Sequence, residues 1–438
     1  VHRHKAGLLP RFLREIFQAH TQDPRFKDMH YSCEFYEVYN DQIRDLLAPN
    51  NAERKRKVHV HPKHGVRIEG STPSLVSSAE EALGLLNFGS QMRTVSSTTM
   101  NERSSRSHAI ITFNWGQEGL SLGSVAHSTP ELVHSTVTFV DLAGREDQGV
   151  SNNKAMQFRE MCFINTSLFH LAHLITKLAE GQVDKTSLTD FRNSKLTLLL
   201  SQALVGNSRT ALVATVAPLQ NYFDDSMSTM SFAQSVRKIQ TCAFVNNKST
   251  GGIVAELEAE VRALRMELEG SKTNASEKET GLVAAEALID YYKRSYEEAL
   301  SSSQEMKAAR SRFSMQYGLS DPANLMQQVR SSKSDPGVLP YFTKLSDDPS
   351  LQGCCNYLVK KSTLGIGSCE QSCDIVLRGL GIAPQMCEVR QDPADGCVYV
   401  EVSNKVENGP VPRVLVNGIS VNADMPPRRM EHGDSIIL

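Results

Sequence analysis

Residues 101–108 read Asn-Glu-Arg-Ser-Ser-Arg-Ser-His and combine amide, hydroxyl, guanidinium and imidazole groups in one short stretch. Neither an amphipathic helix nor a strand needs such a run, so one interpretation is an ordinary polar turn. The alternative is that the hydroxyls bind phosphate oxygens and magnesium while an arginine pairs with a carboxylate. Residues 101–108 are therefore a candidate phosphate-binding segment.

A second candidate segment follows the apolar, β-type run 136–140. It reads Asp141-Leu-Ala-Gly144-Arg-Glu146 and places an acid at the end of the expected strand. A glycine has no side chain, so its backbone N–H can approach a ligand closely. An acid and a glycine in this order are typical of a magnesium-associated carboxylate followed by a phosphate sensor.

The elements that must position these segments alternate between β-type and helical patterns from about residue 7 to residue 245. Apolar residues three and four positions apart predict helices, and short apolar runs rich in β-branched residues predict strands. This alternation predicts an α/β domain whose mixed or parallel sheet is flanked by helices. The expected strands are 32–39, 108–115, 135–140 and 210–216, and the expected helices are 79–87, 158–178 and 194–204.

Three further regions follow the α/β domain, to which we assign residues 1–246. Residues 247–270 carry an apolar seam typical of a short amphipathic helix, which could pair with a second chain. Residues 271–340 are rich in Ser, Glu, Lys and Gln and predict a partly helical linker. Residues 341–438 contain short β-type runs and the turn-forming pair Asn417-Gly418, which predict a small all-β domain.

Residues 1–246 resemble the kinesin motors, whose switch I reads NxxSSRSH and whose switch II reads DLAGSE. Both motifs are nearly intact in the two candidate segments. Several ordered motifs are far more specific than any single one, so the resemblance implies the kinesin motor fold. The further matches, in the order of the family, are residues 35–47, 165–168, 191–197, 206–210 and 232–239.

The resemblance implies ATP and magnesium as cofactors and a role for each site residue. Ser105 and Asp141 would serve magnesium, the latter through a water molecule. A salt bridge between Arg106 and Glu146 would close the two switches over the attacking water. The remaining assignments are Asn101 and Ser104 around the terminal phosphate, Gly144 sensing that phosphate through its N–H, and Asn165 coupling the following helix to the nucleotide.

The same resemblance implies an acidic partner, the microtubule, contacted by Lys63, Arg192 and Lys195. The basic run 54–57 would add charge on this face, although such runs are often solvated loops. The function expected of the complete protein is ATP-driven intracellular transport along microtubules, in the cytoplasm and on the cytoskeleton. The alternative is a non-motile microtubule-binding scaffold.

The family holds its polyphosphate with a GxxxxGK[ST] loop, and residues 1–438 contain no such motif. The resemblance places that loop upstream of Val1, so we expect an N-terminally truncated motor that is inactive alone. The final strand of the C-terminal domain is likewise expected beyond Leu438.

The C-terminal region resembles the forkhead-associated domain of transport kinesins, in residues 345–349, 374–379 and 414–418. That module holds phosphothreonine with an Arg and a His, and both are absent from the corresponding loops, 364–368 and 383–387. We therefore expect this incomplete β domain to dock a cargo or adaptor rather than to read phosphopeptides.

Composition excludes several other classes of function. The 47 Lys and Arg residues nearly balance 49 Asp and Glu residues, for a formal net charge of -2, so nucleic acid is not an expected partner. No apolar run of about 18 residues is present, so membrane insertion is not expected either. Cys369 and Cys373 lack a matching CxxC pair, so the nine cysteines predict reduced, packed thiols rather than a zinc site.

Overall fold

The computed structural model divides the chain into two compact units, residues 1–306 and 307–438, each described here by itself. The residues that the structure describes are 6–23, 29–49, 56–61, 65–71, 73–95, 107–117, 134–144, 155–183, 189–241, 243, 250–270, 275–293, 296–317, 340–343, 345, 356–359, 361–369, 371–377, 381–392, 396–402 and 412–438.

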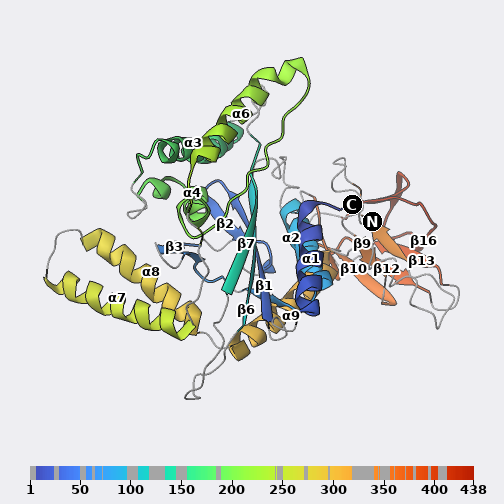
Figure 1. Ribbon diagram of the computed structural model, residues 1–438. Helices are drawn as coiled ribbons and strands as arrows, with labels where there is room; N and C mark the ends of the chain where they lie inside the picture. Colours follow the sequence, from blue (N-terminus) through green and yellow to red (C-terminus); the bar gives the residue numbers. More distant parts are fainter. Residues whose placement is uncertain are drawn as a thin grey trace. The chain divides into compact units, whose positions relative to one another are not determined.

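The first unit is built on a five-stranded sheet with the order β2-β1-β6-β7, to which β5 adds by pairing with β1 (Figure 1). Every described pair in this sheet is antiparallel. The long central strand β1 pairs with β6 from Met29 opposite Gln117 to Val38 opposite His108. The strands are β1 (Met29–Tyr39), β2 (Gln42–Asp45), β5 (Ser74–Val76), β6 (His108–Gln117) and β7 (His134–Asp141).

Helices cover both faces of this sheet. Successive side chains of β1 point to opposite faces, and both sets are buried. Tyr36 and Val38 of β1 belong to the core that includes Leu174 of α3 (Ala155–Ala179). Phe35 of β1 lies instead against α2 (Ala79–Val95), where the ring meets Gly89. The predicted α/β architecture is therefore confirmed. The other helices of the α/β part of this unit are α1 (Leu8–Gln22), α4 (Lys195–Leu199), α5 (Ser201–Val205) and α6 (Phe223–Lys238).

Two sequence-based predictions for this unit differ from the structure. The helix expected at 194–204 is divided into α4 and α5 at Leu200. Ser194 begins α4 with a capping box in which its hydroxyl accepts from the Thr197 N–H, so this start is strongly defined.

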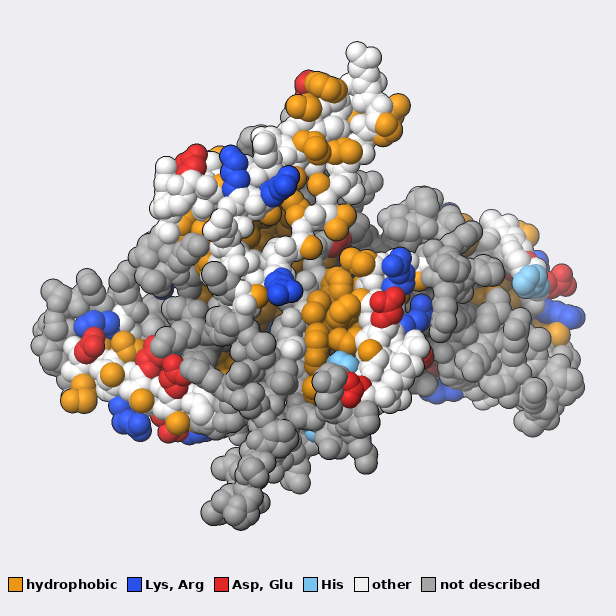
Figure 2. Space-filling view, in the orientation of Figure 1, with side chains coloured by type: hydrophobic (Ala, Val, Ile, Leu, Met, Phe, Trp, Pro, Cys, Tyr) orange, Lys and Arg blue, Asp and Glu red, His pale blue; other side chains and the backbone are white. Residues whose placement is uncertain are grey.

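The strand expected at 210–216 is absent, because residues 208–218 pair with no other strand in the described chain. Its apolar side chains are consequently exposed, as are those in the first half of the following helix α6; Val213 is 79% and Phe223 is 59% exposed. Figure 2 shows hydrophobic side chains on the outer surface of the projecting α6. Alternating apolar residues alone do not make a strand, since its backbone groups also need a partner.

Two helices pack together as an antiparallel pair, α7 (Thr250–Gly270) and α8 (Ala275–Lys293). Leu257 and Val261 of α7 are buried against Ala285 and Leu288 of α8. The apolar seam predicted to pair with a second chain thus faces α8 of the same chain. This helix pair also contacts the hairpin of β3 (Val58–His61) and β4 (Gly65–Ile68), with Arg67 3.7 Å from the centre of the Tyr291 ring.

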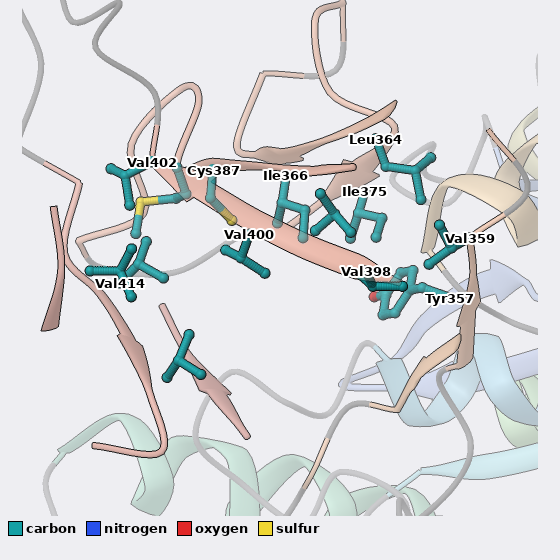
Figure 3. Packing of buried hydrophobic residues seen from close by; sticks show 14 of the residues in the cluster. Tyr357, Val359, Leu364, Ile366, Ile375, Cys387, Val398, Val400, Val402 and Val414 are labelled. Atoms are coloured by element: carbon teal, nitrogen blue, oxygen red, sulfur yellow. The ribbon is translucent and has the colours of Figure 1, made fainter. Parts of the chain in front are cut away.

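The second unit contains short strands, which confirms the predicted all-β region. Its sheets have the orders β11-β10-β12-β13-β16, β15-β14-β17 and β8-β9. Figure 3 shows its valine- and isoleucine-rich core, in which Val359, Val389 and Val400 are fully buried. Asn417 and Gly418 both adopt positive φ, 52° and 78°, and form the predicted tight turn between β14 and β15.

The remaining described elements are one helix and a set of short strands. They are the helix α9 (Tyr296–Tyr317) and the strands β8 (Tyr341–Thr343), β9 (Asn356–Leu358), β10 (Thr363–Gly367), β11 (Ile375–Val376), β12 (Cys387–Gln391), β13 (Val398–Val402), β14 (Val414–Val416), β15 (Ile419–Val421), β16 (Arg428–Met430) and β17 (Ile436–Ile437). None of the helices in the described ranges has the length and apolar character needed to cross a membrane.

Candidate functional site

The two candidate segments adjoin the same end of the central sheet. β6 begins at His108 and β7 ends at Asp141, and the register places Ala109 directly opposite Asp141. Because antiparallel neighbours run in opposite directions, Ser107, just before β6, and residues 142–144, just after β7, lie at the same end of the sheet. Strand pairing therefore unites two motifs that are more than thirty positions apart in the sequence.

Arg93, in the last turn of α2, joins these two strand ends. Its Nη2 donates to the carbonyl oxygen of Ser107 at 2.7 Å, and its Nε donates to the Ser107 hydroxyl at 3.2 Å. Its Nη1 lies 3.4 Å from Oδ2 of Asp141, and its Nε lies 3.9 Å from Oε1 of the buried Glu37. One guanidinium thus bonds to the residue before β6 and to the residue that ends β7.

The Asp141 carboxylate is available for a ligand despite this contact. Its side chain is 75% exposed, whereas that of Arg93 is only 14% exposed. Gly144 is also exposed, so neither group is shielded from an incoming ligand. A carboxylate oxygen is a hard donor suited to magnesium or its water ligands, and a glycine N–H can approach a phosphate oxygen closely. These two residues fit a magnesium–phosphate ligand.

His108 is held on both sides by hydrogen bonds and is only 2% exposed. Its Nδ1 accepts from the backbone N–H of Ala143 at 3.0 Å. Nδ1 therefore carries no proton, and Nε2 is the donor to the Ser167 hydroxyl of α3, also at 3.0 Å. Burial, aided by the nearby charge of Arg93 and partly opposed by Asp141, lowers the pKa of His108 to about 4, so the ring is neutral.

The structure describes only part of the predicted nucleotide site. Asp141 ends β7, and Gly144 lies in the irregular segment that follows it. Asn165 belongs to α3, but its side chain lies outside the description. Asn101, Ser104, Ser105, Arg106 and Glu146 lie outside the described residues.

Sequence reasoning missed Arg93 and Ser167, which contact the two segments directly. Arg93 is a single cation at the end of a mostly apolar helix, and Ser167 is one of several small polar residues in its helix. Arg93 has no spacing that distinguishes it, and Ser167 lies within the motif match 165–168, in which only Asn165 was given a role. The tertiary contacts alone show what these two side chains bind.

The predicted microtubule-binding residues are partly described. Arg192 is exposed in a 3-10 turn (Thr189–Asn193), and Lys195 begins the next helix, α4. The backbone N–H of Lys195 donates to Oδ1 of Asp41 at 2.7 Å, which anchors this corner to the turn after β1. Lys63 lies outside the described residues, between β3 and β4.

The expectation that the basic run 54–57 offers its charge to a partner is wrong for Arg56. Its side chain is 2% exposed, and Nη2 lies 3.3 Å from Oδ2 of Asp45. Its Nη1 also donates to the carbonyl oxygen of Gly70 at 2.5 Å. The Arg56 charge is therefore used inside the fold.

Comparison with known proteins places this site in a family. The family profile described as the kinesin motor domain matches residues 2–239. The chain is 32% identical to mouse kinesin-like protein KIF13A over 445 residues, covering all of this chain and 24% of that protein. It is 28% identical to mouse kinesin-like protein KIF14, over 99% of this chain and 25% of that protein.

A solved structure of KIF14, a dimer in the two-heads-bound state with AMP-PNP and in complex with a microtubule, is 30% identical in sequence. The match covers 58% of this chain and 71% of the KIF14 chain, with a TM-score of 0.49. The chain spans about a quarter of the length of the curated relatives it matches.

Proposed function

Because the chain belongs to the kinesin motor family, we propose that the full-length protein is an ATP-driven motor that moves along microtubules. The observation that carries the proposal is the contact of Arg93 with both Ser107 and Asp141. This contact joins the two segments that match switch I and switch II. Both segments must lie close together if they are to contact the same phosphate.

In this proposal, ATP and magnesium bind where the two segments adjoin. Magnesium supplies charge neutralisation at the phosphates when it is bound. Asp141 holds the magnesium through a water molecule, and Ser105 provides its hydroxyl. Gly144 offers its N–H to the terminal phosphate, with Asn101 and Ser104 beside it. Arg106 and Glu146 would pair to exclude bulk water, and Asn165 would couple α3, the helix that contains it, to the nucleotide.

Hydrolysis also requires a group of N–H donors and a lysine around the polyphosphate, which a GxxxxGK[ST] loop supplies. Such a loop is part of the proposal for the full-length protein, and residues 1–438 alone are expected to be inactive. The test is to measure the ATPase rate of the full-length protein and of residues 1–438, each with and without microtubules. The proposal is supported if microtubules stimulate the full-length protein to a turnover of order one per second or faster, while residues 1–438 show no such turnover. Microtubule binding without turnover in the full-length protein would instead favour a non-motile scaffold.

Arg192, Lys195 and Lys63 are proposed to contact the acidic microtubule surface. The exposure of Arg192 and the anchoring of Lys195 to Asp41 support this role for their corner of the fold. Reversing the charge in Arg192→Glu should weaken co-sedimentation with microtubules, most strongly at low salt, because exposed charges are screened as salt rises. An Arg11→Glu change in α1 is the matched control for loss of one exposed arginine.

The division into motor, residues 1–246, neck helix, 247–270, linker, 271–340, and forkhead-associated-like domain, 341–438, remains part of this proposal. The C-terminal domain is proposed to bind a cargo or adaptor, and a homodimer through the neck helix would require α7 to exchange α8 for a second chain. Such a motor would act in the cytoplasm, on the microtubule cytoskeleton.

A further inference from the structure

His108 is a buried side chain for which the proposed phosphate site has no direct use. It neither points to solvent nor forms an ion pair with Asp141, its charged neighbour at the end of β7. Its two ring nitrogens instead contact two different parts of the chain, the segment that follows β7 and the helix α3. A neutral imidazole with one donor and one acceptor can link two elements in this way only in one tautomer.

We propose that His108 is a positioning residue that mechanically couples the segment Asp141–Gly144 to helix α3. This inference rests on the proposed function, since it gives α3 a means of responding to a ligand at that segment. The Ala143 N–H, one residue before Gly144, donates to Nδ1, and Nε2–H donates to the hydroxyl of Ser167. A displacement of the segment 141–144 therefore acts on the ring and, through the ring, on α3.

The surroundings of His108 favour coupling over simple core packing. Around the ring, Arg93 bonds to the adjacent Ser107, so the backbone beside His108 is restrained. Leu171 and Leu174, one and two turns beyond Ser167, are buried in the core of the sheet, so this part of α3 is anchored to the same unit. A rigid ring between the segment that follows β7 and an anchored helix can transmit a shift of that segment, because packed cores do not deform continuously.

Two substitutions test the link from opposite ends. Ser167→Ala removes the hydroxyl and leaves the imidazole in place. His108→Asn keeps an acceptor near the position of Nδ1, for the Ala143 N–H, but is too short to reach Ser167. Thr176→Val is the control on the same helix, because the Thr176 hydroxyl bonds only locally, to the carbonyl oxygen of Ala172, in the described structure.

The measurement is the microtubule dissociation constant of the full-length protein in ADP and in AMP-PNP. We expect Ser167→Ala and His108→Asn each to reduce the ratio of the two constants about three- to tenfold, the effect of one lost buried hydrogen bond. The double variant should lose no more than either single variant, because both remove the same bond. Thr176→Val should keep the wild-type ratio.

The coupling would be overturned, and the motor proposal left intact, by one result. In it, the wild-type dissociation constant depends on the nucleotide and both single variants keep the wild-type ratio of the ADP and AMP-PNP constants. Additive losses in the double variant would overturn it as well. A wild-type protein with no nucleotide-dependent binding would overturn the motor proposal and the coupling together. Imidazole nitrogen NMR gives an independent readout: the coupling requires an Nε2–H tautomer for His108 near pH 7, and an Nδ1–H tautomer would refute it.

Discussion

Arg56 and Asp45 form a buried ion pair, with 3.3 Å between Nη2 and Oδ2 and side chains that are 2% and 6% exposed. The other oxygen of Asp45 accepts from the backbone N–H of Leu47 at 3.0 Å. Arg56 also donates to the carbonyl oxygen of Gly70. The pair therefore ties the end of β2 to the segments before β3 and after β4.

Replacing Arg56 with methionine should lower the free energy of unfolding by roughly 3–5 kcal/mol, because Asp45 is left as an uncompensated buried charge. Urea unfolding followed by circular dichroism measures this change. The exposed Arg192→Met is the control, with an expected effect within about 0.5 kcal/mol. Equal stability of the two variants would show that the Arg56 pair is not needed for folding.

Arg93→Gln in the full-length protein should reduce the microtubule-stimulated ATPase rate about ten- to a hundredfold. The reason is that the charged hydrogen bonds to Ser107 and the contact with Asp141 are lost together. Steady-state kinetics measure the change, with Arg11→Gln as the matched control on an exposed arginine. A rate unchanged by Arg93→Gln would contradict the role assigned to this guanidinium.

The neutral ring of His108 should make stability fall in mildly acidic solution. Its pKa is about 4 in the folded chain and near 6.5 when unfolded. The stabilisation is present in full above pH 6.5, and it is lost as the pH falls from there towards 4, because only the unfolded chain then binds the proton. Between about pH 7 and pH 5 the loss should be about 2 kcal/mol.

The control for this pH effect is His108→Asn, which cannot titrate. Urea unfolding at several pH values should show the wild type losing stability relative to this variant over that interval. Parallel pH profiles for the two proteins would show that His108 does not supply the effect.

Two glycines of α2 should respond oppositely to alanine. Gly84 is exposed and an added Cβ would meet no other atom, so Gly84→Ala should stabilise by about 1 kcal/mol through helix propensity. At Gly89 the added Cβ would overlap the ring of Phe35, so Gly89→Ala should destabilise by about 1–3 kcal/mol. Thermal unfolding compares the two variants, and a stabilising Gly89→Ala would refute the close helix–sheet packing.

The local pattern of the sequence was sufficient to predict the three long strands of the first sheet and one tight turn of the second unit. The runs around Tyr36, Ile110 and Phe139 predicted three strands of the sheet, and the Asn417-Gly418 pair predicted its turn, because these depend on side-chain alternation and local backbone preference. The motifs ending at His108 and beginning at Asp141 likewise marked the candidate site through their residue types alone.

Other features depended on partners that a linear pattern does not name. The 210–216 run has a strand pattern but no paired neighbour in the described structure, and the seam at Leu257 is buried by α8 rather than by a second chain. Arg56 belongs to a basic run, yet its guanidinium forms a buried ion pair with Asp45.

The amino-acid sequence by itself determined the long strands of the sheet, several helices, one tight turn and the residues that could meet a phosphate, because these follow from short-range spacing and chemistry. Only the tertiary structure decided that Arg93 reaches both Ser107 and Asp141, and that His108 links Ala143 to Ser167. The physical reason is that hydrogen bonds and burial depend on three-dimensional distance, which strand pairing and helix packing establish between residues remote in the chain.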